Sequence, residues 1–521
     1  MTDFSQPYPS QRAPVCADNL VASSQPLAVE AGVDALRRGG NSVDAALATA
    51  ITLTVVEPDM NGVGSDAFAI LWDGNELVGL NASGRAPQAW TADYFAHYGE
   101  MPQFGWDSVT VPGAVSAWVM LSERFGKLPF ADLFRAAIHY AEDGFPVGPR
   151  TAAAWSEAQS LYRDIPSFAP TFSPAPKVGR RVRRADIGQT LRLIAASRGE
   201  AFYQGELADK IEAAAIADGG AMRKSDLASH TAEWVTPTAQ DYRHVTLHEI
   251  PPNGQGLAAQ IALGILKHRD PPPLDSADAV HLQIEAMKIA IGAAFEHFAD
   301  PRAMRLTPEE LLAPGSLARA AEGISARASD LPPVSLPISH DTVYLTAADA
   351  SGKMVSYIQS NYWGFGSGVV IPGTGIAMQN RGWGFTLDAS HPNCVGPGKR
   401  PFHTIIPGFV TEGGAPRMSF GVMGGHMQHQ GHVQMINRMF DHGQNPQAAA
   451  NAPRWHVYED FAVGLEAGMP PSLVSDLEKR GHRVCIEPLE RVFGGAQIIL
   501  RTNDGYVGGS DPRKDGLVAG Y

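Results

Sequence analysis

The sequence predicts an α+β fold, with most of the helices before residue 330 and most of the strands after residue 342. Three observations support this prediction. Apolar side chains recur at helical spacing in the first part, and short β-forming runs separated by turn residues make up much of the second part. The change between the two is abrupt, because a proline-broken stretch ends at residue 341 and a strand begins at once.

The first part contains several segments with the signals of helices. The segment "PLAVEAGVDALRRGG" has apolar residues at helical spacing and ends at Gly39 and Gly40, which is typical of a helix C-terminus. Asn41 and Ser42 are then suitable caps for the next helix, "VDAALATAITLTVV". We expect two further helices in "AVSAWVMLSERFGKLPFADLFRAAIHYAEDG" and a long one in "SADAVHLQIEAMKIAIGAAFEHFAD".

The stretch from about 302 to 341 is rich in Ala, Pro, Ser and Arg and contains "LPPVSLPIS". Because prolines can join neither a helix interior nor a sheet ladder, we predict a flexible, exposed linker there. Beyond it, "TVYLTAAD", the turn "ASGK" and the run "MVSYIQS" predict a β-hairpin. We therefore divide the chain into residues 1–341 and 342–521.

The composition is that of an ordinary globular protein. The chain has 521 residues, 44% of them hydrophobic and 18% charged, with a formal net charge of −13. An acidic surface argues against nucleic acid and anionic membranes as partners. The N-terminal "MTDFSQPYPSQRAP" lacks the basic and apolar segments of a signal peptide, and "AALATAITLTVV" is too short to span a bilayer. We therefore expect a cytoplasmic protein.

Thr342 opens the predicted hairpin, and its position suggests a specific chemistry. If the bond between Asp341 and Thr342 were cut, the threonine hydroxyl would lie close to a new α-amino group. Such an amine has a pKa near 8 and can take the proton of its own hydroxyl, which activates the oxygen as a nucleophile. A threonine that simply starts a strand as a β-former is the alternative, and this segment alone leaves both interpretations open.

Motifs on both sides of this boundary resemble the γ-glutamyltranspeptidase family. In the second part they are "DTVYLTAADASGKMVSYIQSNYWGFGSGVVIPGTGIAMQNRGWGF", "PNCVGPGKRPFHTIIP", "GVMGGHMQ", "NAPRWH" and "GGSDPRKDGLVAGY". In the first part they are "GGNSVDAALATAITLTVVEPDMNGVGSDAF", "SGRAP", "TVPGAVSAW" and "AEDGFPV". They stand in the family's order from about Ala22 to Tyr521, which makes the resemblance specific.

The resemblance implies an N-terminal-nucleophile hydrolase with a four-layer αββα sandwich and no cofactor. Such a proenzyme cuts itself, here into a large subunit, 1–341, and a small subunit, 342–521, when Thr342 attacks the Asp341 carbonyl. Ser360 matches a hydroxyl residue that orients the nucleophile. Gly424 and Gly425 match the pair whose backbone N–H groups form an oxyanion hole, and glycine allows the close approach that this needs.

Several departures from the family pattern concern the substrate. The family holds the α-carboxylate of a γ-glutamyl group with an arginine and a serine pair, and its α-ammonium with an acidic residue. Here Arg85 lies two residues beyond the place of the family's arginine, and His403 and Thr404 replace the serines. Gly384 stands at the acidic position, and Arg381 replaces a neutral amide.

A buried ammonium without an acidic partner is costly, so the pocket is predicted to disfavour free γ-glutamyl groups. Arg85, Arg381 and His403 can instead hold a carboxylate. We predict an amidohydrolase that cleaves a small carboxylate-bearing amide, such as oxamate, through an acyl-enzyme. Alternatives are a γ-glutamyltransferase or glutathione hydrolase, a glutaryl-type (cephalosporin) acylase, and an unprocessed, catalytically silent homologue. Whether the two-subunit units pair further stays open.

Other motifs give no sign of a metal or nucleotide. In "GGHMQHQGH", His426, His429 and His432 stand three residues apart, and on a helix this spacing fans them over about 120°. The motif "GVGSDAF" lacks the third glycine and the preceding strand of a dinucleotide loop. The three cysteines fit neither a metal spacing nor a disulfide framework.

Overall fold

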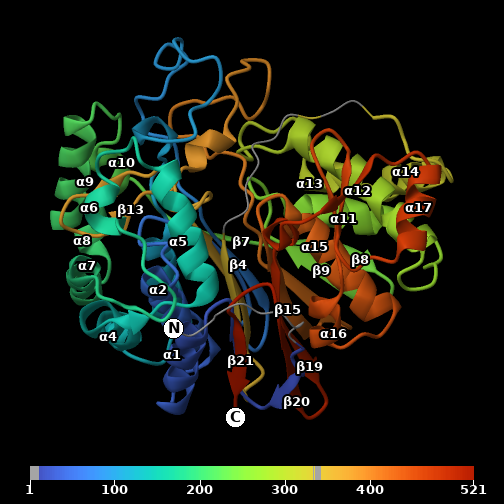
Figure 1. Cartoon of the computed structure of the whole chain (residues 1–521), viewed down its shortest axis with the longest axis horizontal. Coiled ribbons are helices and arrows are strands. Elements are labelled where there is room, and N and C mark those ends of the chain that lie inside the picture. Colours follow the sequence, from blue (N-terminus) through green and yellow to red (C-terminus); the bar gives the residue numbers. More distant parts are fainter. Residues whose placement is uncertain (1–10, 332–333, 335–341) are drawn as a thin grey trace.

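Two β-sheets packed face to face form the centre of the molecule, and helices cover the outer face of each sheet (Figure 1). The computed structural model describes residues 11–331, 334 and 342–521. Three layers of apolar side chains separate the four layers of secondary structure, one between the sheets and one under each helix layer. The four-layer αββα sandwich that the resemblance implies is thus confirmed.

Each sheet has seven strands, and all neighbouring strands in both sheets are antiparallel. The first sheet has the order β21 (Leu517–Gly520), β2 (Leu20–Ser23), β10 (Val343–Ala348), β11 (Met354–Ser360), β3 (Asp66–Trp72), β4 (Leu77–Ala82) and β7 (Glu233–Val235). The second has the order β1 (Val15–Ala17), β20 (Gly505–Ser510), β19 (Gly495–Thr502), β15 (Ala415–Met423), β14 (Gly408–Glu412), β9 (Val245–Glu249) and β8 (Thr238–Tyr242). Both sheets contain strands from before and from after residue 342, so the two parts of the chain share one core.

The helices divide between the two outer layers (Figure 1). Beside the first sheet lie α1 (Pro26–Arg37), α2 (Ser42–Val56), α3 (Ala114–Phe125), α4 (Arg135–Asp143), α5 (Pro149–Leu161), α6 (Ala169–Phe172), α7 (Ala185–Ser197), α8 (Glu200–Tyr203), α9 (Glu206–Ala217) and α10 (Lys224–Ala228). Beside the second lie α11 (Gly256–Leu266), α12 (Ala277–His297), α13 (Pro308–Leu311), α14 (Pro314–Gly323), α15 (Met427–Ile436), α16 (Pro446–Asn451) and α17 (Pro471–Lys479). Small sheets join β5 (Phe145–Pro146) to β6 (Arg181–Val182), β12 (Val370–Ile371) to β13 (Ile376–Ala377), and β16 (Trp455–Val457) through β17 (Val463–Glu466) to β18 (Val484–Glu487).

Strand β10 lies near the middle of the first sheet and is buried on both faces. Val343 and Leu345 point to the helix layer, and Tyr344 points between the sheets. The predicted hairpin is confirmed, since β10 pairs with β11 through a turn in which Gly352 has φ +91°. The pairing with β11 from Val343 onward and with β2 from Leu345 onward holds the start of the strand in the core.

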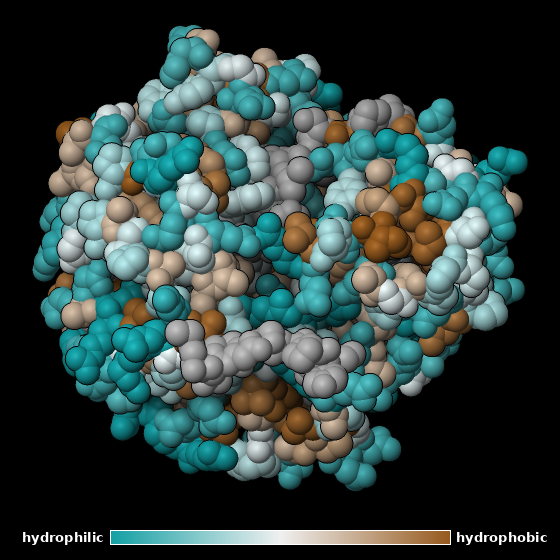
Figure 2. Space-filling model, in the orientation of Figure 1, coloured by the Kyte–Doolittle hydropathy of each residue, from teal (hydrophilic) through white to brown (hydrophobic). Residues whose placement is uncertain are grey.

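The helices predicted within 26–40, 43–56, 114–144 and 276–300 are confirmed as α1, α2, α3 with α4, and α12. Asn41 caps α2, because its side chain accepts from the Val43 and Asp44 amides while the Asp44 carboxylate accepts from the Asn41 amide. Hydrophilic side chains cover most of the face shown in Figure 2, in keeping with the acidic composition. In the described ranges, no helix is long and apolar enough to cross a membrane.

The predicted linker does not begin at residue 302. Helices α13 and α14 form inside it, and their prolines, Pro308 and Pro314, stand in the first helical turn, where a missing N–H costs nothing. Leu317 and Ala321 of α14 are buried in the core beneath the second sheet. The prediction of an exposed linker is therefore wrong for α14, whereas α13 has no buried residue. Residues 332–333 and 335–341, including Asp341, lie outside the described residues.

Candidate active site

Thr342 and Ser360 face each other across the β10–β11 hairpin. The register pairs Val343 with Gln359, which places Thr342 opposite Ser360. The Thr342 Oγ1 donates to the Ser360 Oγ at 3.4 Å and accepts from the Gln428 Nε2 at 3.4 Å. Both hydroxyl residues are fully buried, with 0% of their surface exposed. The structure thus brings together the predicted nucleophile and its predicted orienting hydroxyl.

Ser360 is in turn held by its own chain. Its Oγ accepts a hydrogen bond from the Tyr362 amide at 2.8 Å. Tyr362 has φ +83°, a backbone conformation that is unfavourable for a bulky residue. Such strain persists only where the surroundings enforce it, and it concentrates at functional sites. The Ser360 Oγ is therefore held in position to accept a hydrogen bond from the Thr342 hydroxyl.

Gly424 and Gly425 form the junction between β15 and α15. They have φ +116° and +59°, and a Cβ atom at Gly424 would lie 2.9 Å from the Gly494 Cα, so glycine is needed there. Neither amide has a hydrogen-bond acceptor among the residues that the structure describes. Two free amides at a helix N-terminus are suited to bind an oxyanion.

Gln428 links this glycine pair to Thr342 and was missed by the sequence analysis. It lies in the first turn of α15, and its amide N–H donates to the Gly425 carbonyl at 3.2 Å. Its Oε1 accepts from the Ile406 amide at 2.9 Å, so the Nε2 side of the group faces Thr342. The signal in the sequence was its place three residues after the glycine pair, at the start of a helix.

Arg381 is a buried cation, and two of its three guanidinium nitrogens have no partner among the described residues. It begins the short 3-10 turn η3 (Arg381–Gly384) and is 1% exposed. The Nη1 donates to the Thr404 Oγ1 at 2.8 Å, and the guanidinium lies over the Tyr362 ring, 4.5 Å from its centre. The Nε and Nη2 have no partner among the described residues. Burial lowers the pKa of Arg381 to about 10, so it stays charged at neutral pH.

Gln255 ties the arginine to the glycine pair. Its Nε2 donates to the carbonyl of Thr404, the residue that holds Arg381, and to the carbonyl of Gly425 at 2.8 Å. The contacts of Gln428 and Gln255 therefore join the hydroxyl pair, the glycine pair and the arginine into one small buried region. Of the predicted site residues, Thr342, Ser360, Gly424, Gly425, Arg381 and Thr404 belong to it directly.

His403 lies beside this region as a neutral imidazole. Its Nδ1 accepts from the Ile405 amide at 3.5 Å, and its Nε2 is 3.1 Å from the Asp66 carboxylate. Burial, with Arg381 and Arg400 nearby, holds the pKa of His403 well below its ordinary value. The interpretation of His403 as a cation for a carboxylate does not agree with this environment.

Asp66 is a second residue that the sequence analysis missed. It is the first residue of β3, directly opposite Ser360 in the sheet, and it is fully buried. It accepts hydrogen bonds from the Gly113 amide at 3.0 Å and from His403. Burial raises the pKa of Asp66 to about 7, although Arg381 opposes the shift. Its signal was the single carboxylate in the quoted motif "GVGSDAF".

Arg85 lies in an ion-pair network with other protein groups. Its Nη2 is 2.8 Å from Glu233 and its Nη1 is 3.3 Å from Asp300, and 29% of its side chain is exposed. Arg400 contacts the same two carboxylates, through its Nη1 and its amide. A substrate carboxylate would have to compete with Glu233 and Asp300 for Arg85, whereas no carboxylate in the described ranges accepts a hydrogen bond from the Nε or Nη2 of Arg381.

The sequence model of the γ-glutamyltranspeptidase family matches residues 28–521 of this chain. The chain belongs to this family. Among curated relatives, the glutathione hydrolase-like YwrD proenzyme of Bacillus subtilis is 35% identical, over 96% of this chain and 98% of its own. The oxamate amidohydrolase proenzyme of Klebsiella pneumoniae is 34% identical, over 97% and 99%.

Comparison with solved structures also finds an enzyme of this kind. The cephalosporin acylase from Bacillus halodurans has a TM-score of 0.96 and 46% sequence identity, and the match covers 100% of this chain and 99% of the acylase. These relatives are enzymes that act on amide C–N bonds, and this γ-glutamyltranspeptidase-family chain is an enzyme of the same kind, with the N-terminal-nucleophile hydrolase fold.

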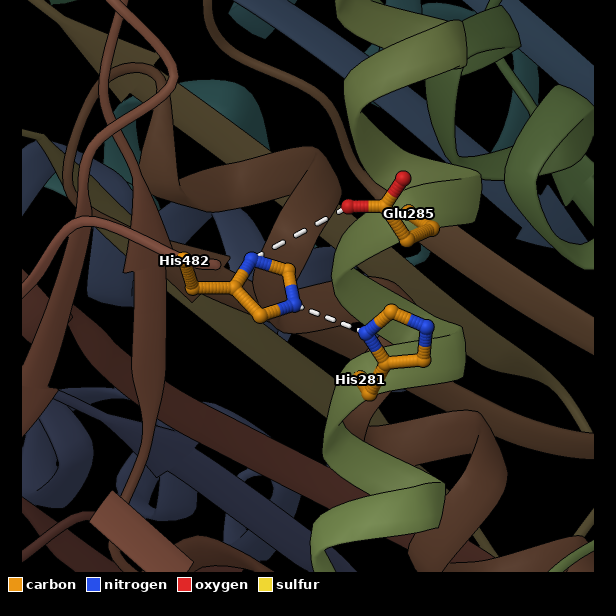
Figure 3. A group of neighbouring side chains, drawn as sticks. All are labelled: His281, Glu285 and His482. Carbon is orange, nitrogen blue, oxygen red and sulfur yellow. Dashed lines mark hydrogen bonds and ion pairs between the residues drawn. The ribbon is translucent and has the colours of Figure 1, made fainter. Parts of the chain in front are cut away.

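The histidines of α15 do not converge in this family member. His429 Nδ1 is 2.9 Å from the Gln255 Oε1, and His432 Nδ1 is 2.6 Å from Glu249. Within the described ranges, the group with metal-ligand spacing is His281, Glu285 and His482, two residues of α12 and one that precedes β18 (Figure 3).

In this group, Lys288 already takes the place of a cation. Its Nζ lies 2.9 Å from the Glu285 Oε1 and 3.4 Å from the His482 Nδ1. The His482 Nε2 is 2.7 Å from the His281 Nδ1, and the His281 Nε2 is 2.8 Å from the Ser325 carbonyl. Each of these contacts can join one donor to one acceptor, because the Lys288 Nζ donates to Glu285 and His482, the His482 Nε2 to His281, and the His281 Nε2 to the Ser325 carbonyl. The cluster is therefore best explained as a contact that joins the first part of the chain to His482 in the second.

Proposed function

We propose that this protein is an autoprocessing N-terminal-threonine amidohydrolase for a small carboxylate-bearing amide, of which oxamate is the simplest. The observation that carries the proposal is the unpartnered edge of Arg381. Buried polar groups nearly always have partners, so two guanidinium nitrogens without a partner among the described residues require an explanation. The Nε and Nη2 lie on the same edge, which is the arrangement that a carboxylate binds with both oxygens.

Self-cleavage is the first step of the proposal. The Thr342 Oγ1 attacks the carbonyl carbon of Asp341, the C–N bond breaks, and the nitrogen leaves as the α-amine of Thr342. Water then opens the resulting ester to give the subunits 1–341 and 342–521. Thr342 is fully buried in the uncut chain, so we expect substrate to reach it only after this cut. The interleaved strands of both sheets keep the subunits together.

In turnover, the new α-amine takes the proton of the Thr342 hydroxyl, and the oxygen attacks the amide carbon of the substrate. The negative charge that develops on the substrate oxygen is stabilised by the amides of Gly424 and Gly425. The amide nitrogen leaves as ammonia with the proton from the α-ammonium. Water then hydrolyses the ester, and for oxamate the product is oxalate. Arg381 holds the substrate carboxylate during these steps.

Gly425→Val is expected to lower kcat by about 10²–10³-fold, the usual effect of losing an oxyanion donor. Gly413→Val is the matched control, because Gly413 has φ +58°, close to the +59° of Gly425, and lies in open space. Both variants place valine at nearly the same positive φ. A lower kcat in the processed Gly425→Val enzyme than in the processed Gly413→Val enzyme therefore reports an effect at the site rather than of backbone strain. A soluble Gly425→Val enzyme as fast as the Gly413→Val enzyme would contradict the assignment.

The affinity for an anionic substrate is expected to fall as pH rises through about 7. Asp66 has a raised pKa of about 7, so it is neutral below that pH and charged above it. Ionised Asp66 offsets the charge of Arg381 and weakens the hold on a carboxylate. The KM for oxamate should therefore rise severalfold between about pH 6 and about pH 8. Asp66→Asn should remove this rise in KM. A wild-type KM that stays constant over this pH range would contradict the role assigned to Asp66.

A comparison of substrates on one processed preparation tests the proposed function. We expect kcat/KM for oxamate to exceed that for glutathione by about 10²-fold or more, since an ammonium buried without a partner costs about 3–5 kcal/mol. Glutaryl amides test the acylase alternative, and a γ-glutamyl anilide tests acyl transfer. If glutathione or the anilide is preferred by tenfold or more, the proposal for the substrate fails.

A glutathione hydrolase is the second candidate, and Glu459 favours it. Its carboxylate is half-buried and near Tyr362, whose pKa is raised mainly by burial and further by Glu459. Burial and the neighbouring Asp460 raise the pKa of Glu459 to about 7. Ionised Glu459 would offer a partner to a substrate ammonium. In that case Glu459→Gln would lower kcat/KM for glutathione and leave that for oxamate unchanged.

A further inference from the structure

We infer that Tyr362 is a positioning residue that couples the nucleophile to the carboxylate-binding arginine, and that its ring limits the length of the acyl group. The inference rests on the proposed role of Arg381. Tyr362 contacts both ends of the site, since its amide bonds the Ser360 Oγ and its ring lies against the Arg381 guanidinium.

The backbone contact is maintained against strain. Tyr362 has φ +83°, where glycine is favoured and a side chain with a Cβ is strained. In this conformation its N–H donates to the Ser360 Oγ, 2.8 Å away. The same oxygen accepts a hydrogen bond from the Thr342 hydroxyl. The strained residue therefore helps to set the direction of the nucleophile.

The contact with the Tyr362 ring helps to fix the position of the Arg381 guanidinium. The aromatic face of Tyr362 lies 4.5 Å from the Arg381 Cζ, and the Trp383 ring packs 5.5 Å from the Tyr362 ring. Thr404 takes the Nη1. One face and one end of the guanidinium are thus occupied, and the edge with Nε and Nη2 is left for a carboxylate. A stacked cation of this kind is held firmly when it is desolvated.

Together these contacts fix the separation between the attacking oxygen and the bound carboxylate. Ser360 and Tyr362 are two residues apart in one chain segment, so the distance can change little while the ring is present. Without the ring, the guanidinium loses a supporting face and space opens beside it. Longer acyl groups should then be accepted, and short ones should be held less well.

Three variants separate the ring from the backbone. Tyr362→Phe keeps the aromatic ring and the strained backbone, so we expect it to keep the wild-type glutaryl-amide to oxamate ratio of kcat/KM. Tyr362→Ala keeps the strained backbone without the ring, and it should raise the KM for oxamate by about tenfold or more. It should also shift the glutaryl-amide to oxamate ratio of kcat/KM toward the longer substrate by about tenfold.

Tyr362→Gly removes the ring and also the strain. It should show the same shift in substrate ratio as Tyr362→Ala, with a higher melting temperature and a lower kcat, because a relaxed backbone holds Ser360 less firmly. If the alanine and glycine variants process normally and keep the wild-type substrate ratio, the inference is overturned. Failure of the proposed function is seen separately, in the substrate preference of the wild-type enzyme itself.

Discussion

Thr342→Ala is expected to give a folded protein that stays one chain and has no measurable amidase activity. One hydroxyl serves both self-cleavage and turnover in the proposed mechanism, so its removal should abolish both. A denaturing gel and an amide-hydrolysis assay on the same preparation measure the two effects. Thr342→Ser retains a hydroxyl and should still be cut.

Thr346→Ala is the control for this change. Thr346 is a fully buried threonine on the same strand, and its hydroxyl is 2.6 Å from the Ser419 hydroxyl rather than in the site. Its loss should lower stability by about 1 kcal/mol without preventing cleavage. A Thr342→Ala protein that still divided before residue 342 would show that another group is the nucleophile.

Arg381→Leu is expected to lower kcat/KM for oxamate by about 10²–10³·⁵-fold, the range that corresponds to about 3–5 kcal/mol for a lost buried charge partner. The loss should appear mainly in KM, because the arginine binds a carboxylate that does not react. Arg381→Lys should fall in between, since it keeps the charge but loses the two-point contact. Steady-state kinetics on processed enzyme measures both.

Arg85→Leu distinguishes the two predicted carboxylate ligands. Arg85 already pairs with Glu233 and Asp300, so we expect its loss to lower the melting temperature and to change kcat/KM for oxamate by less than about threefold. The reverse pattern is a large loss of kcat/KM in Arg85→Leu and a small one in Arg381→Leu. It would show that Arg85, and not Arg381, binds the substrate carboxylate.

Local sequence patterns were sufficient for much of the fold. The β10–β11 hairpin followed from alternation and a glycine turn, and its register alone brings Thr342 to Ser360. The caps of α1 and α2 followed from Gly39 and Asn41. The error at α13 and α14 has a local cause as well, because the same prolines that break a helix interior are favourable in its first turn.

Contacts between distant segments could not be predicted in this way. Asp66 reaches the site because β3 pairs with β11. Gln428 reaches it because the first turn of α15 lies next to Thr342. His403 lies near Arg381, but its neutral state depends on burial, which a motif does not show. The difference between Arg85 and Arg381 likewise depends on whether protein carboxylates lie within reach.

The masses and N-terminal sequences of the chains in purified wild-type enzyme test the central claim most directly. The proposed mechanism predicts two chains in an active preparation, the smaller one running from Thr342 to Tyr521 with a free α-amino group. An active preparation that is uncut, or that is cut at another bond and lacks an N-terminal Thr342, would contradict it.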